Sequence, residues 1–204
     1  MYEILRFCAL LSLTFLISAN SLASQLRDGD IIFQTSLSSQ SKAIQKATHS
    51  KFSHVGIIFL KNGKPYVFEA ARNVQYTQVN EWIAHGEGRH NVVMRLRLAD
   101  QHLTTEAVSK LRKVANTFRG KPYDPAFEWS DERIYCSELV WKIYERAMNI
   151  RVGSLHKLGD LDLSDATVRA KMKERYRDHV PLEETVISPA DIYASDNLMI
   201  MNEE

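Results

Sequence analysis

Apolar residues recur at every third or fourth position in two long stretches of this chain, which is the spacing of one buried face of an α-helix. The first stretch predicts a helix from Thr104 to Phe118, ended by Gly120. The second predicts a helix from Cys136 to Met148. Both helices are long enough, and apolar enough on one side, to be expected against the core of the protein.

Shorter stretches are rich in β-branched and aromatic residues, a composition typical of strands. They cover Ile31–Phe33, Val55–Leu60 and Pro65–Ala70. Asn62-Gly63 separates the last two, and Asn-Gly between apolar runs is the strongest short signal for a hairpin. The sequence therefore predicts one antiparallel hairpin over residues 54–70.

The rest of the pattern completes a mixed fold. Residues 91–98 alternate between apolar and polar positions and predict a further strand packed on one face. The tail after Asp196 has no clear pattern, and no repeat or Pro/Gly linker divides the chain. We expect a single α+β domain, with a small antiparallel sheet packed against helices. Shorter helices are expected at 42–48, 80–85, 166–176 and just after Ser188-Pro189.

Residues 1–23 have the features of a secretory signal peptide. The apolar run from Phe7 to Ile17 is too short to span a bilayer comfortably. Ser21-Leu22-Ala23 places small side chains where a signal peptidase reads them. We expect cleavage after Ala23, a mature domain of residues 24–204 and a periplasmic location. No other stretch is long and apolar enough to cross a membrane.

Composition and charge narrow the class of protein. Of the 204 residues, 45% are hydrophobic, which is enough for one core that is stable without disulfides. The formal net charge is only +1. Because no basic cluster is large enough to cover a face, a nucleic-acid partner is not expected. The pattern does not specify an oligomeric state.

A single thiol would remain after cleavage, because Cys8 lies in the leader and Cys136 in the mature chain. A secreted protein with one cysteine cannot form an internal disulfide. Cys136 begins a predicted helix, where the macrodipole and unpaired N–H groups favour a thiolate. Two interpretations stand at this point: Cys136 is a nucleophile, or it is a small buried hydrophobic residue.

A thiolate nucleophile needs a base for its proton and a third group to orient that base. Pairing the hairpin about Asn62-Gly63 puts His54 close to residues 70 and 71. His54 and Glu69 would then be cross-strand or diagonal neighbours, with Cβ atoms about 5–8 Å apart. A slip of one residue would turn one of them to the other face. The alternatives are an ordinary strand histidine and an edge charge.

The start of the helix at Cys136 and Ser137 also offers N–H groups that could face a developing oxyanion. The hydroxyl of Tyr123, in the turn after Gly120, is a second candidate donor. Packing of the turn is the alternative explanation for this tyrosine.

No metal site is expected from the sequence. His49 with His54, and His85 with His90, do not have the spacing of zinc ligands, and no second cysteine is available in the mature chain. The sequence likewise gives no reason to expect a cofactor.

Five short motifs stand in a fixed order along the chain. They are Gly29-Asp30-Ile31-Ile32-Phe33, Ser53-His54-Val55-Gly56, Val67-Phe68-Glu69-Ala70, Gly120-Lys121-Pro122-Tyr123-Asp124 and Tyr135-Cys136-Ser137-Glu138-Leu139-Val140. Together they resemble the YiiX-like branch of the NlpC-type cysteine hydrolases, over about residues 28–195. The resemblance implies a circularly permuted papain-like fold, in which the histidine and glutamate precede the cysteine. It also implies that Cys136, His54 and Glu69 form the catalytic triad, with Tyr123 near the nucleophile.

Three functions remain open. The first is an exported cysteine amidase or peptidase acting on peptidoglycan peptides, and the second is a hydrolase or acyltransferase with the same triad acting on lipid-like acyl substrates. The third is a non-catalytic binding protein on the same scaffold. An apolar groove beside Cys136 would favour lipid-like substrates, whereas arginine or lysine would favour muropeptides. Residues 153–184 match no motif and are candidates for shaping that groove.

Overall fold

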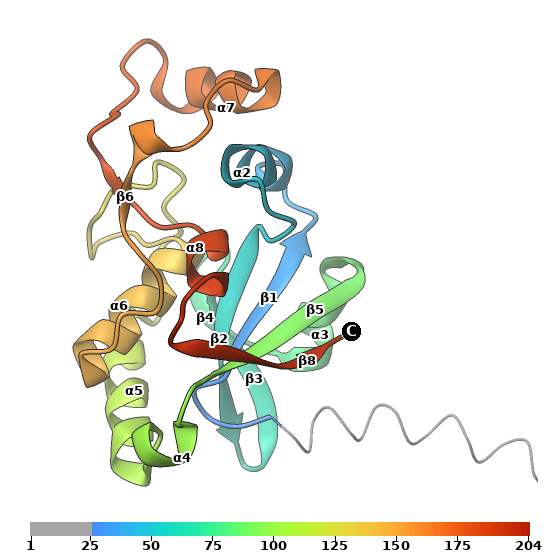
Figure 1. Cartoon of the computed structure of the whole chain (residues 1–204), viewed down its shortest axis with the longest axis vertical. Helices are drawn as coiled ribbons and strands as arrows, with labels where there is room; N and C mark the ends of the chain where they lie inside the picture. The colour runs from blue at the N-terminus through green and yellow to red at the C-terminus, as the bar shows by residue number, and fades with distance from the viewer. Residues whose placement is uncertain (1–25) are drawn as a thin grey trace, which may run out of the picture.

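The computed structural model describes residues 26–204, and its centre is a six-stranded antiparallel sheet in the order β4-β3-β2-β1-β5-β8 (Figure 1). The expected leader and its cleavage site lie outside the described residues. The strands of the sheet are β1 (Ile31–Ser36), β2 (His54–Lys61), β3 (Lys64–Ala70), β4 (Val74–Gln78), β5 (Gly86–Leu96) and β8 (Leu198–Glu203). Two short strands, β6 (His156–Lys157) and β7 (Thr185–Val186), pair separately.

Helices lie on both sides of this sheet and beyond one of its ends. Figure 1 shows α5 and α6 side by side, with α2 and α7 together at one end of the molecule. None of the helices within residues 26–204 combines the length and apolarity needed to cross a bilayer. The helices are α2 (Ser41–Thr48), α3 (Val79–Ala84), α4 (Ala99–His102), α5 (Thr105–Phe118), α6 (Cys136–Met148), α7 (Ala166–Tyr176) and α8 (Pro189–Tyr193), with a 3₁₀ turn at Leu158–Asp160.

The central strands are buried on both faces, which explains why their sequences are continuously apolar. Ile31 and Phe33 point into the larger hydrophobic cluster, which includes the inward faces of α5 and α6. Ile32 points into the smaller cluster on the opposite face, together with Trp82 of α3. Side chains alternate between the faces of a strand, so each face receives its own set of apolar residues.

The predicted hairpin is confirmed. Ile57 of β2 lies opposite Phe68 of β3, and Lys61 lies opposite Lys64. Asn62 and Gly63 between them both have positive φ, at 51° and 73°. Positive φ at both central residues is what a two-residue type I′ turn requires. This turn fixes the register along the whole length of the two strands.

The two long helices are also confirmed, with ends close to those expected. Thr104 caps α5 by accepting a hydrogen bond from the N–H of Ala107 at 3.2 Å. The apolar side of α6 is buried, and the hydroxyl of Tyr144 donates to the backbone carbonyl of Gly29. That bond attaches the middle of α6 to the loop before β1.

Some elements were not foreseen. β4 and α4 were missed, and β5 begins at Gly86, five residues before the predicted strand. The tail after Asp196 was expected to be poorly specified, but it forms β8 at the edge of the sheet beside β5. Met199 and Ile200 of β8 are exposed, so backbone pairing with β5, rather than an amphipathic pattern, orders this strand.

A buried ion pair joins Asp30, the residue before β1, to Arg95 of β5. The guanidinium of Arg95 donates two hydrogen bonds to the carboxylate of Asp30, at 2.6 and 2.8 Å. Asp30 is fully buried, and the backbone N–H of Arg27 donates to it at 2.8 Å. Because water cannot replace these partners, each charge depends on the other for its stability.

We expect Asp30→Ala to lower the free energy of unfolding by about 3–5 kcal/mol, because it removes the buried carboxylate that accepts two hydrogen bonds from Arg95. Urea unfolding followed by circular dichroism measures this change. Asp100→Ala is the matched control, since Asp100 pairs with Arg27 on the surface at 2.9 Å and should contribute little. Equal effects of the two substitutions would contradict the importance of the buried pair.

Candidate active site

His54 and Glu69 meet at one end of the sheet. The register of the hairpin makes them diagonal neighbours, with His54 at the first position of β2 and Glu69 near the end of β3. Nε2 of His54 lies 2.6 Å from Oε2 of Glu69. Both side chains are mostly shielded from solvent, with exposed fractions of 13% and 5%. The contact predicted from the hairpin is therefore present.

Two further residues hold the Glu69 carboxylate. The Thr77 hydroxyl donates to Oε1 at 2.5 Å, and the Trp82 indole N–H donates to Oε2 at 2.8 Å. Trp82 also stacks on the His54 ring, with centroids 5.6 Å apart and planes 25° apart. Sequence reasoning missed both residues. The available signal was that a tryptophan on a short apolar helix needs an acceptor for its N–H when it is buried.

The electrostatics favour a charged pair. Burial alone would raise the pKa of Glu69, but hydrogen bonds and the charge of His54 outweigh it and lower that pKa. Burial alone would lower the pKa of His54, whereas its hydrogen bonds and charge interactions with Cys136 and Glu69 raise it to about 10. A positively charged ring beside a cysteine sulfur is the arrangement that favours nucleophilic chemistry at that sulfur.

Cys136 is the first residue of α6, and its thiol interacts with the His54 ring. Since Nε2 of that ring contacts Glu69, Nδ1 is the nitrogen that remains for the sulfur. The cysteine side chain is buried, with 3% of the residue exposed, but it lines a pocket that opens to the surface. The sulfur is therefore shielded without being enclosed in the core.

Tyr123 lies beside the thiol, in the segment between α5 and α6. Its hydroxyl accepts a hydrogen bond from Nε2 of Gln40 at 2.6 Å, so its own O–H remains available to donate. Burial, followed by the charge of Cys136, raises the pKa of Tyr123 above its ordinary value. A neutral phenol near the sulfur is a suitable donor to an oxyanion. Gln40 was not singled out from the sequence.

Ser137 can serve an oxyanion through its backbone N–H group, because its hydroxyl is already bonded to the backbone. Its Oγ donates to the backbone carbonyl of Ile187 at 2.7 Å, which attaches α6 to the segment before α8. The first N–H groups of a helix have no acceptor within the helix. The backbone N–H groups of Cys136 and Ser137 are therefore the donors that this end of α6 can offer.

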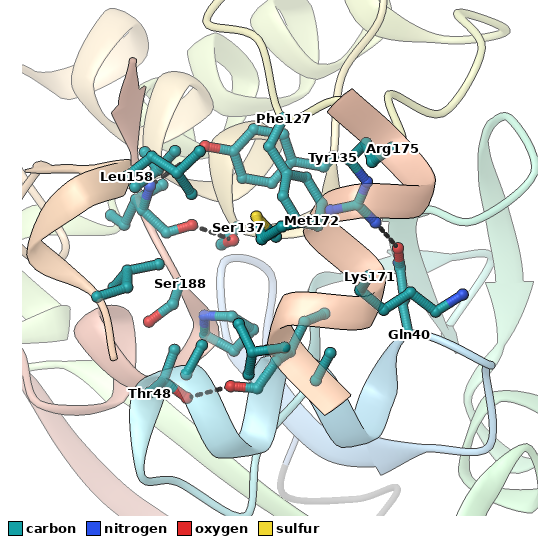
Figure 2. A pocket seen from close by; sticks show the side chains of 18 of the residues that line it. Gln40, Thr48, Phe127, Tyr135, Ser137, Leu158, Lys171, Met172, Arg175 and Ser188 are labelled. Carbon is teal, nitrogen blue, oxygen red and sulfur yellow. Dashed lines mark hydrogen bonds between the residues drawn. The ribbon is translucent and has the colours of Figure 1, made fainter. Parts of the chain in front are cut away.

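A narrow apolar pocket extends from Cys136 between α2 and α7 (Figure 2). The space between its walls is about 690 Å³, counted to the open mouth. Figure 2 shows Met172 of α7 pointing toward the Ser137 side of the pocket, with Lys171 and Arg175 toward its edge. The apolar walls include Ala43, Ile44, Ala47, Phe127, Leu158, Leu161, Leu163, Val168, Val186 and Pro189.

Arg175 lies at the edge of this apolar pocket, where two neighbouring residues hold its guanidinium. Its guanidinium donates to Oε1 of Gln40 at 3.1 Å and lies over the Phe127 ring, 4.3 Å from the centroid. Gln40 in turn donates to Tyr123. The segment between β6 and β7, which matched no motif, thus supplies one wall of the pocket and a hydrogen-bonded connection to the site.

A second cavity, the polar cleft, lies on the His54 side of the site. Gln40 and Tyr123 line both cavities and so stand between them. The polar cleft is more open, with about 1210 Å³ of space counted to its mouth. Its lining combines apolar residues, Leu37, Ala70, Ala71 and Ala84, with many polar side chains: Gln34, Ser36, Ser53, His54, Glu69, Arg72, Gln75, Thr77, Glu81, Trp82 and His85.

Two of the four histidines considered as metal ligands pair with carboxylates. His49 pairs with Asp162, Nε2 to Oδ2 at 3.1 Å, and His54 pairs with Glu69. Within residues 26–204, no three side chains of histidine, cysteine, aspartate or glutamate gather as a metal site.

Comparison with known proteins identifies close similarities. Residues 25–201 match the family described as permuted papain-like amidase enzymes, YaeF/YiiX, C92 family. The chain is 50% identical over 195 residues to the uncharacterized protein YiiX of Escherichia coli K12, covering 96% of this chain and 95% of that protein.

The fold agrees with a solved structure as well. The crystal structure of metalloprotein yiiX from Escherichia coli O157:H7 superposes on this chain with a TM-score of 0.84, and the two sequences are 51% identical. The match covers 88% of this chain and 98% of the other. The word metalloprotein describes that relative; the described residues of the present chain do not gather a ligand set for a metal.

The rate at which iodoacetamide alkylates Cys136 near pH 7 should depend on the charge of the His54 ring beside the sulfur. The pKa of His54, raised to about 10, keeps that ring positively charged at this pH. Glu69→Gln removes a charge that raises this pKa, so the ring loses its proton at lower pH. We expect the alkylation rate near pH 7 to fall about tenfold.

His85→Ala is the control for this measurement, because His85 lines the same cleft but is exposed. This substitution should leave the alkylation rate of Cys136 unchanged. An unaltered alkylation rate in Glu69→Gln would show that the carboxylate does not set the charge of His54.

Proposed function

Since the chain belongs to the permuted papain-like amidase family, we propose that it is a cysteine amidase with Cys136, His54 and Glu69 as its triad and an apolar acyl group as part of its substrate. The observation that carries the substrate class is the pocket beside the sulfur, whose walls are almost entirely apolar. A pocket of this lining favours hydrocarbon over peptide.

The acylation step follows from the contacts. The Cys136 thiolate attacks the carbonyl carbon of the amide, forming a C–S bond and placing negative charge on the carbonyl oxygen. Tyr123 and the N–H groups at the start of α6 donate to that oxygen. The C–N bond then breaks, and the His54 imidazolium gives its proton to the departing nitrogen. A thioester on Cys136 and a neutral amine result.

Deacylation uses the same groups, but His54 now acts as the base. The neutral His54 ring takes a proton from water, and the oxygen attacks the thioester carbonyl. The C–S bond breaks, the carboxylic acid leaves, and the thiolate and imidazolium are restored. Glu69 keeps the ring in one orientation through both steps, because Thr77 and Trp82 hold the carboxylate still.

Cell-wall peptides are the second candidate substrate, and Arg175 is the observation that favours them. Its guanidinium forms no ion pair with another described residue, and it is held in place by Gln40 and Phe127. A fixed guanidinium suits the carboxylate of a peptide. The apolar walls of the pocket outweigh this single charge, so we place acyl amides first and muropeptides second.

Export to the periplasm is part of the proposal. The supporting observation is the leader pattern of residues 1–23, with its short apolar run and small residues before the expected cleavage site. In that compartment both membrane lipids and peptidoglycan would be accessible to the enzyme.

The wild-type protein should form a thioester on Cys136 with a decanoyl amide, seen as an added acyl mass in an acid-quenched sample, whereas Cys136→Ser should not hydrolyse the amide.

Met172→Trp should fill the apolar pocket and lower kcat/KM for decanoyl amides about tenfold or more, while kcat/KM for acetyl amides changes little. Lys173→Trp, one residue away and exposed, is the control.

Mass spectrometry of sacculi and of a lipid panel, each digested with wild type and Cys136→Ser, separates the two substrate classes. Release of muropeptide fragments without any hydrolysis of acyl amides would reverse their order. No Cys136-dependent product from either source would reject the amidase.

Expressed with its own leader in a bacterium with a periplasm, the protein should be recovered from the periplasmic fraction with Ser24 as its first residue. Intact-mass measurement and N-terminal sequencing check this. Ala23→Phe should block processing, because the peptidase needs a small side chain there. A full-length protein in the cytoplasmic fraction would contradict export.

A further inference from the structure

Tyr123 stands where the two cavities of the site meet. It lines the apolar pocket together with Cys136 and the polar cleft together with His54. Its backbone pairs with that of Ile134, two residues before Cys136, so the tyrosine is attached to the segment that carries the sulfur. The proposed amidase chemistry, on which the following proposal rests, needs the O–H of Tyr123 directed at the oxyanion.

The partners of a phenol hydroxyl decide where its single hydrogen points. Nε2 of Gln40 donates to the Tyr123 oxygen at 2.6 Å. An N–H group directed at this oxygen excludes the phenol hydrogen from that direction. In the part of the chain that the structure describes, the Tyr123 hydroxyl has no second hydrogen-bond partner. Its hydrogen is therefore left for a group that binds in the site.

This availability holds only while the Gln40 amide keeps one orientation. An amide turned by 180° fills the same space but presents its oxygen to Tyr123. That oxygen would accept the phenol hydrogen and withdraw it from the oxyanion. Gln40 is the N-cap residue of α2, yet its side chain does not cap the helix. The helix that carries Gln40 thus does not decide the orientation of its amide.

Arg175 of α7 decides it. A guanidinium has donors only, so the atom of Gln40 that faces it must be the oxygen. Nη2 of Arg175 donates to Oε1 of Gln40 at 3.1 Å, a contact that Figure 2 shows at the edge of the apolar pocket. The guanidinium itself lies over the Phe127 ring, 4.3 Å from the centroid. With Oε1 held by Arg175, the NH₂ group faces Tyr123.

We propose that Arg175 and Gln40 are positioning residues that fix the direction of the Tyr123 O–H and so make this tyrosine an oxyanion donor. The hydrogen bonds all run in one sense: guanidinium to amide, amide to phenol, and phenol to oxyanion. Neither Arg175 nor Gln40 has to touch the reacting atoms. α7, which forms a wall of the apolar pocket, thereby also supports the chemistry at Cys136.

Gln40→Glu reverses this sense with almost no change of shape. An ionised carboxylate only accepts, so one oxygen keeps the contact with Arg175 while the other takes the phenol hydrogen. We expect the single-turnover acylation rate with decanoyl 4-nitroanilide, followed by release of 4-nitroaniline, to fall about 10²-fold, as when one oxyanion donor is lost. Tyr123→Phe should lower the rate by a similar factor. A rate in Gln40→Glu within about threefold of wild type overturns the proposal.

The double variant Gln40→Glu/Tyr123→Phe tests whether the added charge acts directly. If the carboxylate acts through the phenol, the double variant should be no more than about threefold slower than Tyr123→Phe alone. A larger further loss shows that the charge of Glu at position 40 acts on the sulfur or the oxyanion without Tyr123, and overturns the proposal.

Arg175→Met removes the donor that orients Gln40 and leaves the amide free to turn. The acylation rate should fall by at least about threefold, but by less than in Gln40→Glu, because part of the population keeps the productive orientation. Arg169→Met is the matched control, since Arg169 is an exposed arginine of α7 that lines neither cavity. It should retain the wild-type rate. A wild-type rate in Arg175→Met overturns the proposal.

Alkylation of Cys136 by iodoacetamide separates positioning from a general disturbance of the site, because this reaction forms no oxyanion. The alkylation rate should stay within about threefold of wild type in Arg175→Met and in Tyr123→Phe. Losses of alkylation that match the losses of acylation show a structural role and overturn the proposal.

Failure of the amidase itself would give a different result, because wild type would then release no 4-nitroaniline. A wild type that releases 4-nitroaniline at a rate that Gln40→Glu and Arg175→Met leave unchanged rejects only the positioning roles of these two residues.

Discussion

The contact between the Glu69 carboxylate and the His54 imidazole is the interaction on which the site depends. A carboxylate buried this deeply is stable only if protein groups replace the water it has lost. Thr77 and Trp82 supply two of those groups, and His54 supplies the third together with a positive charge. The same three contacts that stabilise the charge also fix the ring, so burial and orientation have one cause.

Cys136, the proposed nucleophile, contacts this pair from the other side. Cys136 begins α6, whose backbone N–H groups and dipole favour negative charge at that end. The His54 ring lies between the sulfur and the carboxylate and is held positive by both. The charges of His54 and Glu69 would each be unfavourable if they were buried alone. Together with the sulfur, these two side chains form a compact polar unit inside an otherwise apolar framework.

The surroundings of this unit are strongly asymmetric. One side is the apolar pocket walled by α2 and α7, and the other is the polar cleft at the end of the sheet. Gln40 and Tyr123 divide them, and Arg175 attaches α7 to that division. A substrate with two chemically different halves would fit this arrangement in only one direction.

The sequence by itself determined the local parts: the hairpin about Asn62-Gly63, the two long helices, and the diagonal placement of His54 and Glu69. These depend on short-range spacing and turn geometry, which a sequence displays directly. Only the tertiary structure decided which segments meet. Pairing with β5 ordered the C-terminal tail, Trp82 and Thr77 reached Glu69 from elements that periodicity does not connect, and residues 158–175 closed one wall of the pocket. Such contacts join residues far apart in the chain, so their partners are set by packing of the whole fold and not by any local pattern.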